Sequence, residues 1–158
     1  MELWELVARE QIRDTIARYN HAGDSGHFDE MVEQFHPAGV LEIADNGERH
    51  EGRVALRAFF DAVAQRFATT APARPDGGVL RHCVSNVRIA VDDPRAARSD
   101  AYFHVITPIG LDHWGRYRDR FVPHDGRWLL LHRSVRTDGY AEGSRFAPDP
   151  SQPPGPTR

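Results

Sequence analysis

Two side chains with acid–base chemistry, His82 and Asp24, carry most of what the sequence says about function. His82 begins an apolar segment in which alternate residues share a strand face, so Asn86 would lie on the same face. An imidazole titrates near neutral pH and can therefore accept a proton and return it within one turnover. The alternative is a histidine that only satisfies a local hydrogen bond.

Asp24 fits two roles. It could bind the other ring nitrogen of His82, which would fix the tautomer and stabilise the imidazolium, as in catalytic triads. Asp24, Ser25 and Gly26 also precede a predicted helix, and aspartate is a preferred N-cap. If Ser25 is the cap, Asp24 is free to face a pocket. The residues alone leave both roles open.

Further candidates lie on the helices and strands around this pair. Tyr19 ends the apolar stripe of the first predicted helix, where its phenol could donate to a ligand or simply complete the core. His104 is predicted on the strand after His82, facing the same pocket. Asp119, which stands among three arginines, is expected on a solvated sheet face or subunit contact. The predicted substrate contacts are Asn86, Tyr117, Arg133 and Phe60.

Composition argues against several classes of protein. The 158 residues carry a formal net charge of -3, which gives no basic face for nucleic acid. Cys83 is the single cysteine, so neither an intramolecular disulfide nor a cysteine-rich metal site is expected. No apolar run has the length of a membrane span, and Met1 to Glu10 lack a signal-peptide core. A cytoplasmic protein is therefore expected.

The motifs of cofactor and covalent chemistry are also missing from the sequence. The nine histidines have no spacing typical of a metal site, and no glycine-rich loop indicates a nucleotide. Cys83 should lie on the strand face opposite His82, and no nucleophile elbow occurs. We therefore expect no metal and no cofactor.

Hydrophobic periodicity predicts helices followed by a run of strands, which favours an α+β fold. Short turns between the last four strands favour an antiparallel meander. We expect one domain over 1–140, with a strongly curved sheet against three helices around a pocket, and a proline-rich tail over 141–158. The predicted helices cover 3–21, 28 up to Pro37, and 54–67; the predicted strands cover 40–43, 49–51, 80–91, 99–107, 112–122 and 127–137; residues 69–78 form a loop at the pocket rim.

The order of these pieces resembles the SnoaL-like branch of the NTF2-like superfamily over residues 3 to about 138. It implies an α+β cone with a deep pocket, which commonly forms homodimers or homotrimers. The matching pieces are Tyr19 with Asp24, Phe28 to Pro37, Gly52-Arg53, Arg81-His82 with Asn86, Gly115-Arg116-Tyr117-Arg118-Asp119, and Gly126-Arg127-Trp128 running to Arg133.

Three relatives implied by this resemblance catalyse eliminations: scytalone dehydratase, a bile-acid dehydratase and lindane dehydrochlorinase. They share a histidine–aspartate pair at positions that look like His82 and Asp24. Tyr19 stands five residues before Asp24, as in the bile-acid enzyme, whereas the dehydrochlorinase has a lysine at that place.

The resemblance thus implies a cofactor-free lyase for a hydrophobic ring compound. His82 would take a proton from an activated carbon. Tyr19, with His104 acting as one histidine does in the scytalone enzyme, would polarise the substrate or protonate a departing hydroxyl. An isomerase or cyclase with the same residues, and a non-catalytic ligand-binding domain, are the alternatives.

Overall fold

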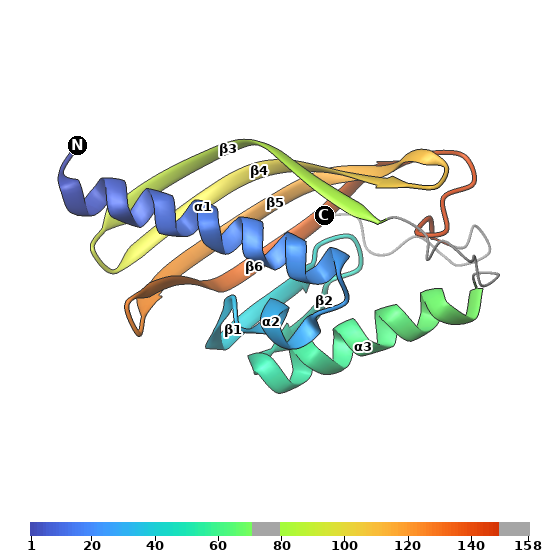
Figure 1. Cartoon of the computed structure of the whole chain (residues 1–158), viewed down its shortest axis with the longest axis horizontal. Helices are drawn as coiled ribbons and strands as arrows, with labels where there is room; N and C mark the ends of the chain where they lie inside the picture. Colours follow the sequence, from blue (N-terminus) through green and yellow to red (C-terminus); the bar gives the residue numbers. More distant parts are fainter. Residues whose placement is uncertain (71–79, 149–158) are drawn as a thin grey trace.

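The computed structural model describes residues 1–70 and 80–148, and within them a curved, unclosed six-stranded sheet carries helices on one face (Figure 1). The strand order is β2-β1-β6-β5-β4-β3. The helices are α1 (Leu3–Asp24), α2 (Phe28–Val32) and α3 (Gly52–Thr70); the strands are β1 (Phe35–Ile43), β2 (Glu48–Glu51), β3 (Arg81–Asp93), β4 (Ala96–Thr107), β5 (Gly110–His124) and β6 (Arg127–Tyr140).

The predicted α+β class and the antiparallel meander of the last four strands are confirmed. The predicted rim loop falls largely on 71–79 and the predicted tail largely on 149–158, which lie outside the described residues. No helix in the described ranges is both long and apolar enough to cross a membrane.

The prediction for the second helix was wrong over its last part. The α2 helix ends at Val32, and Phe35 already belongs to β1, where it is fully buried and pairs with Leu130. Pro37 restricts the residue before it to extended backbone, so the chain there continues as a strand. A break in the pairing between Phe35 and Val40 accommodates the proline.

A second difference concerns β1, which pairs with β6 in parallel, whereas the remaining neighbours are antiparallel. The pairing joins Leu41 to Arg133 and Ile43 to Val135. Periodicity along a chain gives no information on which distant strand will become a neighbour, so the sequence could not supply this contact.

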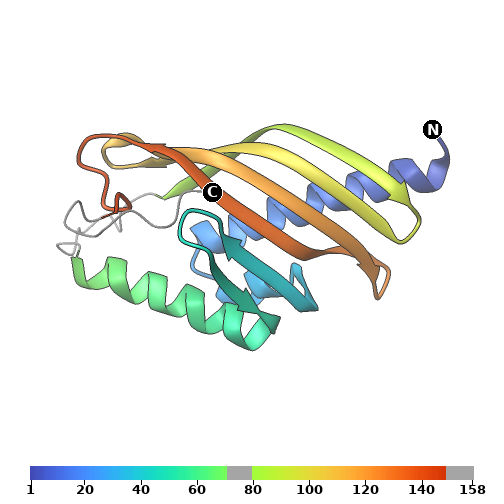
Figure 2. The same cartoon turned by 180° about the vertical axis from the view of Figure 1, so that it is seen from behind.

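The core lies between α1 and the inner, helix-bearing face of the sheet (Figures 1 and 2). Its α1 side is an apolar stripe at helical spacing that includes Ile12, Ile16 and Tyr19. Leu56 of α3 and Phe121 of β5 are similarly buried. Burial of this stripe fixes the rotation of α1, and with it the direction in which Asp24 leaves the helix end.

Candidate active site

The end of α1 meets the beginning of β3 where Asp24 contacts His82. His82 Nδ1 lies 2.6 Å from Asp24 Oδ1, and the His82 backbone N–H donates to Asp24 Oδ2 at 2.9 Å. The carboxylate therefore holds both the ring and its strand. The side chain of His82 is 25% exposed and that of Asp24 only 8%, so the ring remains reachable while its partner is shielded. With Nδ1 occupied, Nε2 is the nitrogen available to a ligand.

Asp24 is the last residue of α1 and does not cap α2. The N-cap position of α2 is His27, and no side chain caps that helix. Ser25 was predicted to be that cap if Asp24 were released, but it occupies the C-cap of α1 instead. Gly26 has a φ of 72°, and the following His27 N–H returns to the Ala22 carbonyl at 2.9 Å, closing the helix.

Deeper on the inner face, two tyrosines enclose a buried ion pair. Arg133 donates to both oxygens of Asp119 at 2.9 and 2.7 Å, and both side chains are 0% exposed. The guanidinium carbon lies 4.3 Å from the ring centre of Tyr19 and 4.1 Å from that of Tyr117. Arg133 thus donates from two of its nitrogens to one carboxylate and is stacked between two aromatic rings.

The charges of this cluster follow from its burial. Burial raises the pKa of Tyr19, against the opposing effect of Arg133. Burial also raises the pKa of Tyr117, as does its closeness to Tyr19. Both phenols therefore keep their protons and can act as hydrogen-bond donors. Among the described residues, Arg133 Nη1 is a buried donor that has no hydrogen-bond partner.

The prediction for Asp119 was wrong. It was expected on a solvated face or at a subunit contact, yet it is buried inside the chain and pairs across the strands with Ser99 and Arg133. Strand alternation explains the result, because Tyr117, Asp119 and Phe121 share the inner face while the arginines between them face outward.

Two further predicted site residues lie away from His82. Asn86 was expected on the same face, but it is exposed and has a φ of 52° at a break in the β3–β4 pairing. This bulge inserts an extra residue and so changes which residues face inward. His104 is paired with Cys83, next to the His82–Val105 pair, and therefore lies on the outer face. The prediction that Asn86 and His104 face a pocket beside His82 was therefore wrong.

Phe60 packs within the core beside Tyr19. Its ring centre lies 6.2 Å from that of Tyr19 and 6.1 Å from that of Phe28, and the residue is 6% exposed. Phe60, on α3, thus packs its ring edge-to-face against the Tyr19 ring. Of the sequence candidates, the structure thus gathers Tyr19, Tyr117, Arg133 and Phe60 in one cluster, with His82 and Asp24 as a separate pair.

A second histidine–aspartate pair, His113 with Asp112, was not predicted from the sequence. His113 Nδ1 lies 2.9 Å from Asp112 Oδ1. The β4–β5 pairing is irregular at this place, between Val105 and Ile106, so two successive residues can both be buried. Alternation with Tyr117 and Phe121 could have placed His113 on the inner face.

We expect the free energy of unfolding to fall as the pH drops below 6.5, the ordinary pKa of histidine. Burial lowers the pKa of His113, Asp112 opposes the shift, and the charge of His82 adds to it. Below pH 6.5 the unfolded chain binds a proton that the folded chain resists, so acid favours unfolding. Urea unfolding at several pH values should show a smaller loss for His113→Phe than for the unchanged chain. Equal losses would contradict the expectation.

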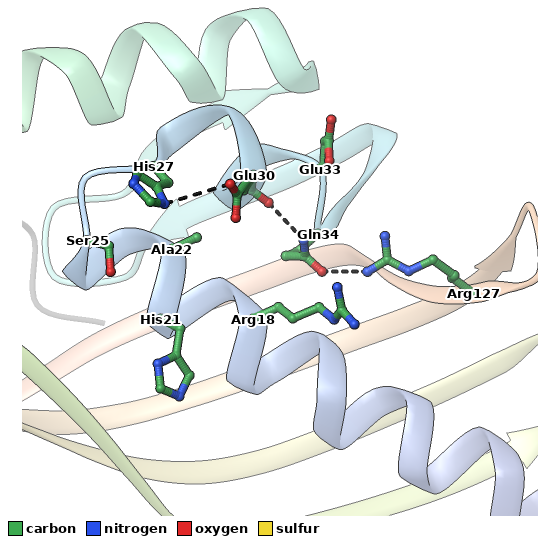
Figure 3. Close-up of a pocket in the computed structure, with 9 residues that line it drawn as sticks. All are labelled: Arg18, His21, Ala22, Ser25, His27, Glu30, Glu33, Gln34 and Arg127. Atoms are coloured by element: carbon green, nitrogen blue, oxygen red, sulfur yellow. Dashed lines mark hydrogen bonds and ion pairs between the residues drawn. The ribbon is translucent and has the colours of Figure 1, made fainter.

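The hollow in Figure 3 lies elsewhere, beside the end of α1 and α2. It has a volume of about 420 Å³, and side chains of both charges line it, with Gln34 joined to Arg127 at 2.7 Å. His82 is not among its lining residues, so this hollow is not the predicted pocket. In the described ranges, no group of three or more His, Cys, Asp or Glu side chains could hold a metal ion.

The curved sheet with its helices defines an α+β protein with the NTF2-like, cystatin-like fold. The SnoaL-like domain family matches residues 4–134, and the chain belongs to that family. No curated protein shows significant similarity to the sequence.

Several solved structures share the fold. A protein from Catenulispora acidiphila is 27% identical, with a TM-score of 0.71 over 85% of this chain and 94% of that one. A Catenulispora acidiphila structure in complex with S-DNPA is 26% identical, with a TM-score of 0.70 over 84% and 95%. A candidate scytalone dehydratase from Novosphingobium aromaticivorans is 21% identical, with a TM-score of 0.73 over 89% and 91%, which shows the fold alone.

Proposed function

We propose that the protein is a cofactor-independent lyase that eliminates water from a hydrophobic cyclic small molecule by general acid–base catalysis. The observation that carries the proposal is the 2.6 Å contact between His82 Nδ1 and Asp24 Oδ1, with the ring still partly exposed. A histidine oriented in this way by a shielded carboxylate is the arrangement in which the histidine of a catalytic triad acts as the general base. The resemblance to the elimination enzymes of the SnoaL-like group supports the same class of reaction, and a candidate scytalone dehydratase shares the fold.

The first step is proton abstraction. His82 Nε2 takes a proton from a carbon next to an electron-withdrawing group, and the negative charge of Asp24 stabilises the imidazolium that forms. The electron pair left on the carbon forms the new double bond. The leaving hydroxyl takes the proton back from His82, so water departs and the histidine returns to its neutral state. His104 has no part in this cycle, because it lies on the outer face.

The aromatic cluster supports the charge that develops on the substrate. Tyr19 is protonated and can donate to an oxygen that becomes negative during the step. Arg133, stacked on Tyr19 and Tyr117, would favour that charge without leaving the core. An isomerase would use the same groups but return the proton to another carbon, and the mass of the product separates the two reactions.

Replacing Asp24 by Asn tests whether Asp24 orients His82 as the base. The carboxylate accepts from the His82 backbone N–H and, at the same time, from Nδ1–H. An amide has only one acceptor oxygen, so one contact must be lost or the ring proton must move to Nε2, where it blocks the base. We expect kcat to fall by roughly 10²–10⁴-fold while the fold is kept.

The measurement is product formation by mass spectrometry with a panel of β-hydroxy cyclic ketones, in which loss of water is read directly. Asp14→Asn is the matched control, because Asp14 forms an exposed pair with Arg18. Its activity should equal that of the unchanged chain. Full activity in Asp24→Asn would contradict the proposal, and a product of unchanged mass would favour the isomerase.

A further inference from the structure

His82 and His113 lie in one row across three strands of the inner face. Val105 of β4 pairs with His82 on one side and with His113 on the other. Side chains of directly paired residues project from the same face of a sheet. Neighbouring strands are about 4.8 Å apart, so the backbones of the two histidines are roughly 10 Å apart. A ring compound that contacts His82 on the inner face would therefore extend toward His113.

Asp112 contacts His113 through the same ring nitrogen, Nδ1, by which Asp24 contacts His82. Its Oδ1 is 2.9 Å from His113 Nδ1 and accepts from Ser144 Oγ at 2.6 Å, while Oδ2 accepts from Thr107 Oγ1 at 2.9 Å. Burial favours the protonated acid, but these hydrogen bonds outweigh it and lower the pKa of Asp112. An ionised carboxylate can only accept, so the proton of the neutral ring lies on Nδ1. His113 Nε2 is thus left with a lone pair.

Aromatic rings surround the imidazole of His113. The ring centre of Phe146 lies 4.4 Å away, that of Tyr140 6.0 Å and that of Phe103 6.2 Å. His113 itself is 7% exposed. Packing on several sides fixes the plane of the ring, and the Asp112 contact fixes its rotation. The direction of the Nε2 lone pair is consequently set before any ligand binds.

Packing alone does not require this arrangement. A buried ionised carboxylate with a polar partner loses hydration, and apolar side chains of similar size usually stabilise a core equally well. Here an aspartate, two hydroxyl groups and a histidine are all used to orient one nitrogen. Burial and the charge of His82 lower the pKa of His113, so the ring is neutral at neutral pH and accepts rather than donates at Nε2.

We propose that His113 is a specificity-determining residue whose Nε2 accepts a hydrogen bond from a hydroxyl group of the ligand, so that the site selects hydroxylated ring compounds. The proposal rests on the proposed function in one respect, that the ligand lies against His82. A ring compound with one edge against His82 would present a hydroxyl on its other edge to His113 Nε2. Asp112 acts through His113 and is a positioning residue.

The test compares two ligands that differ in one group, 2-naphthol and 2-methylnaphthalene, with the full chain and with His113→Phe. Phenylalanine keeps the aromatic packing but removes the acceptor. We expect 2-naphthol to bind His113→Phe roughly tenfold more weakly, and 2-methylnaphthalene to bind both proteins equally. His132→Phe is the matched control, because His132 also contacts a carboxylate, Glu42, at 2.9 Å but lies on the outer face.

Nuclear magnetic resonance of the unchanged chain gives a second readout that does not depend on the variant folding. Long-range ¹H–¹⁵N spectra should show the Nδ1–H tautomer of His113, and 2-naphthol should shift its Nε2 resonance. A different tautomer, no Nε2 shift, equal affinity of the unchanged chain for both ligands, or equal losses of both ligands in His113→Phe would each overturn the proposal. Turnover is not measured here, so a failure of the lyase proposal would appear separately, as full activity in Asp24→Asn.

Discussion

Replacing His82 by Gln should lower turnover by about 10²–10⁴-fold and leave ligand affinity nearly unchanged. The side chain of His82 is 25% exposed and lies near the start of β3, so the fold should tolerate the change. Glutamine can still donate to Asp24, but it has no basic nitrogen. The loss should therefore appear in kcat, because glutamine cannot take the proton in the transition state.

His104→Gln is the control for this variant. His104 is paired with Cys83, the residue that follows His82, and lies on the outer face of the sheet. Its activity should equal that of the unchanged chain. Kinetics with the substrate found by mass spectrometry, together with isothermal calorimetry for affinity, would separate the two variants. Equal losses of kcat in both, or none in His82→Gln, would rule out His82 as the base.

The fold could be predicted from the sequence wherever a local pattern repeats. The apolar stripe of α1 and the alternation of the long strands both give their elements directly. Prediction failed at 33–37, where an apolar residue at helical spacing, Phe35, belongs instead to a strand that includes Pro37. It also failed for the parallel β1–β6 pair, since that contact depends on tertiary packing.

The candidate site, like the fold, could be predicted from the sequence only in part. The His82–Asp24 pair was inferred from family resemblance, because no spacing rule joins residues so far apart. Asn86 was misplaced because one inserted residue reverses the faces beyond it, and a bulge has no clear signature here. His104 was misplaced because the inner face of β4 is set by Ala101, Phe103 and Val105. That choice of face could have been made from the apolar residues themselves.

The buried pair of Arg133 and Asp119 should be the most sensitive point of the fold. Arg133→Met removes the cation and leaves Asp119 as an uncompensated charge with 0% side-chain exposure. We expect a loss of about 3–5 kcal/mol in the free energy of unfolding, measured by urea titration with tryptophan fluorescence. Ser99, which donates to Asp119 at 3.3 Å, cannot replace two charged donors.

Two comparison variants test whether this loss of stability comes from the unpaired buried charge. Arg118→Met breaks an exposed pair with Asp100, 3.9 Å long, and should change stability by less than about 0.5 kcal/mol. The double variant Arg133→Met with Asp119→Leu removes both charges and should recover most of the loss, because apolar replacement of a whole buried pair is often neutral. A single-variant loss below about 1 kcal/mol would contradict the burial of an unpaired charge.

The double variant also separates stability from function. If its stability recovers while turnover does not, the core does not need the ion pair and the catalysed reaction does. That outcome follows if Arg133 favours negative charge next to Tyr19 and Tyr117, whose rings it contacts at 4.3 and 4.1 Å. Recovery of both would instead make the pair a packing feature and would leave His82 and Asp24 as the essential groups.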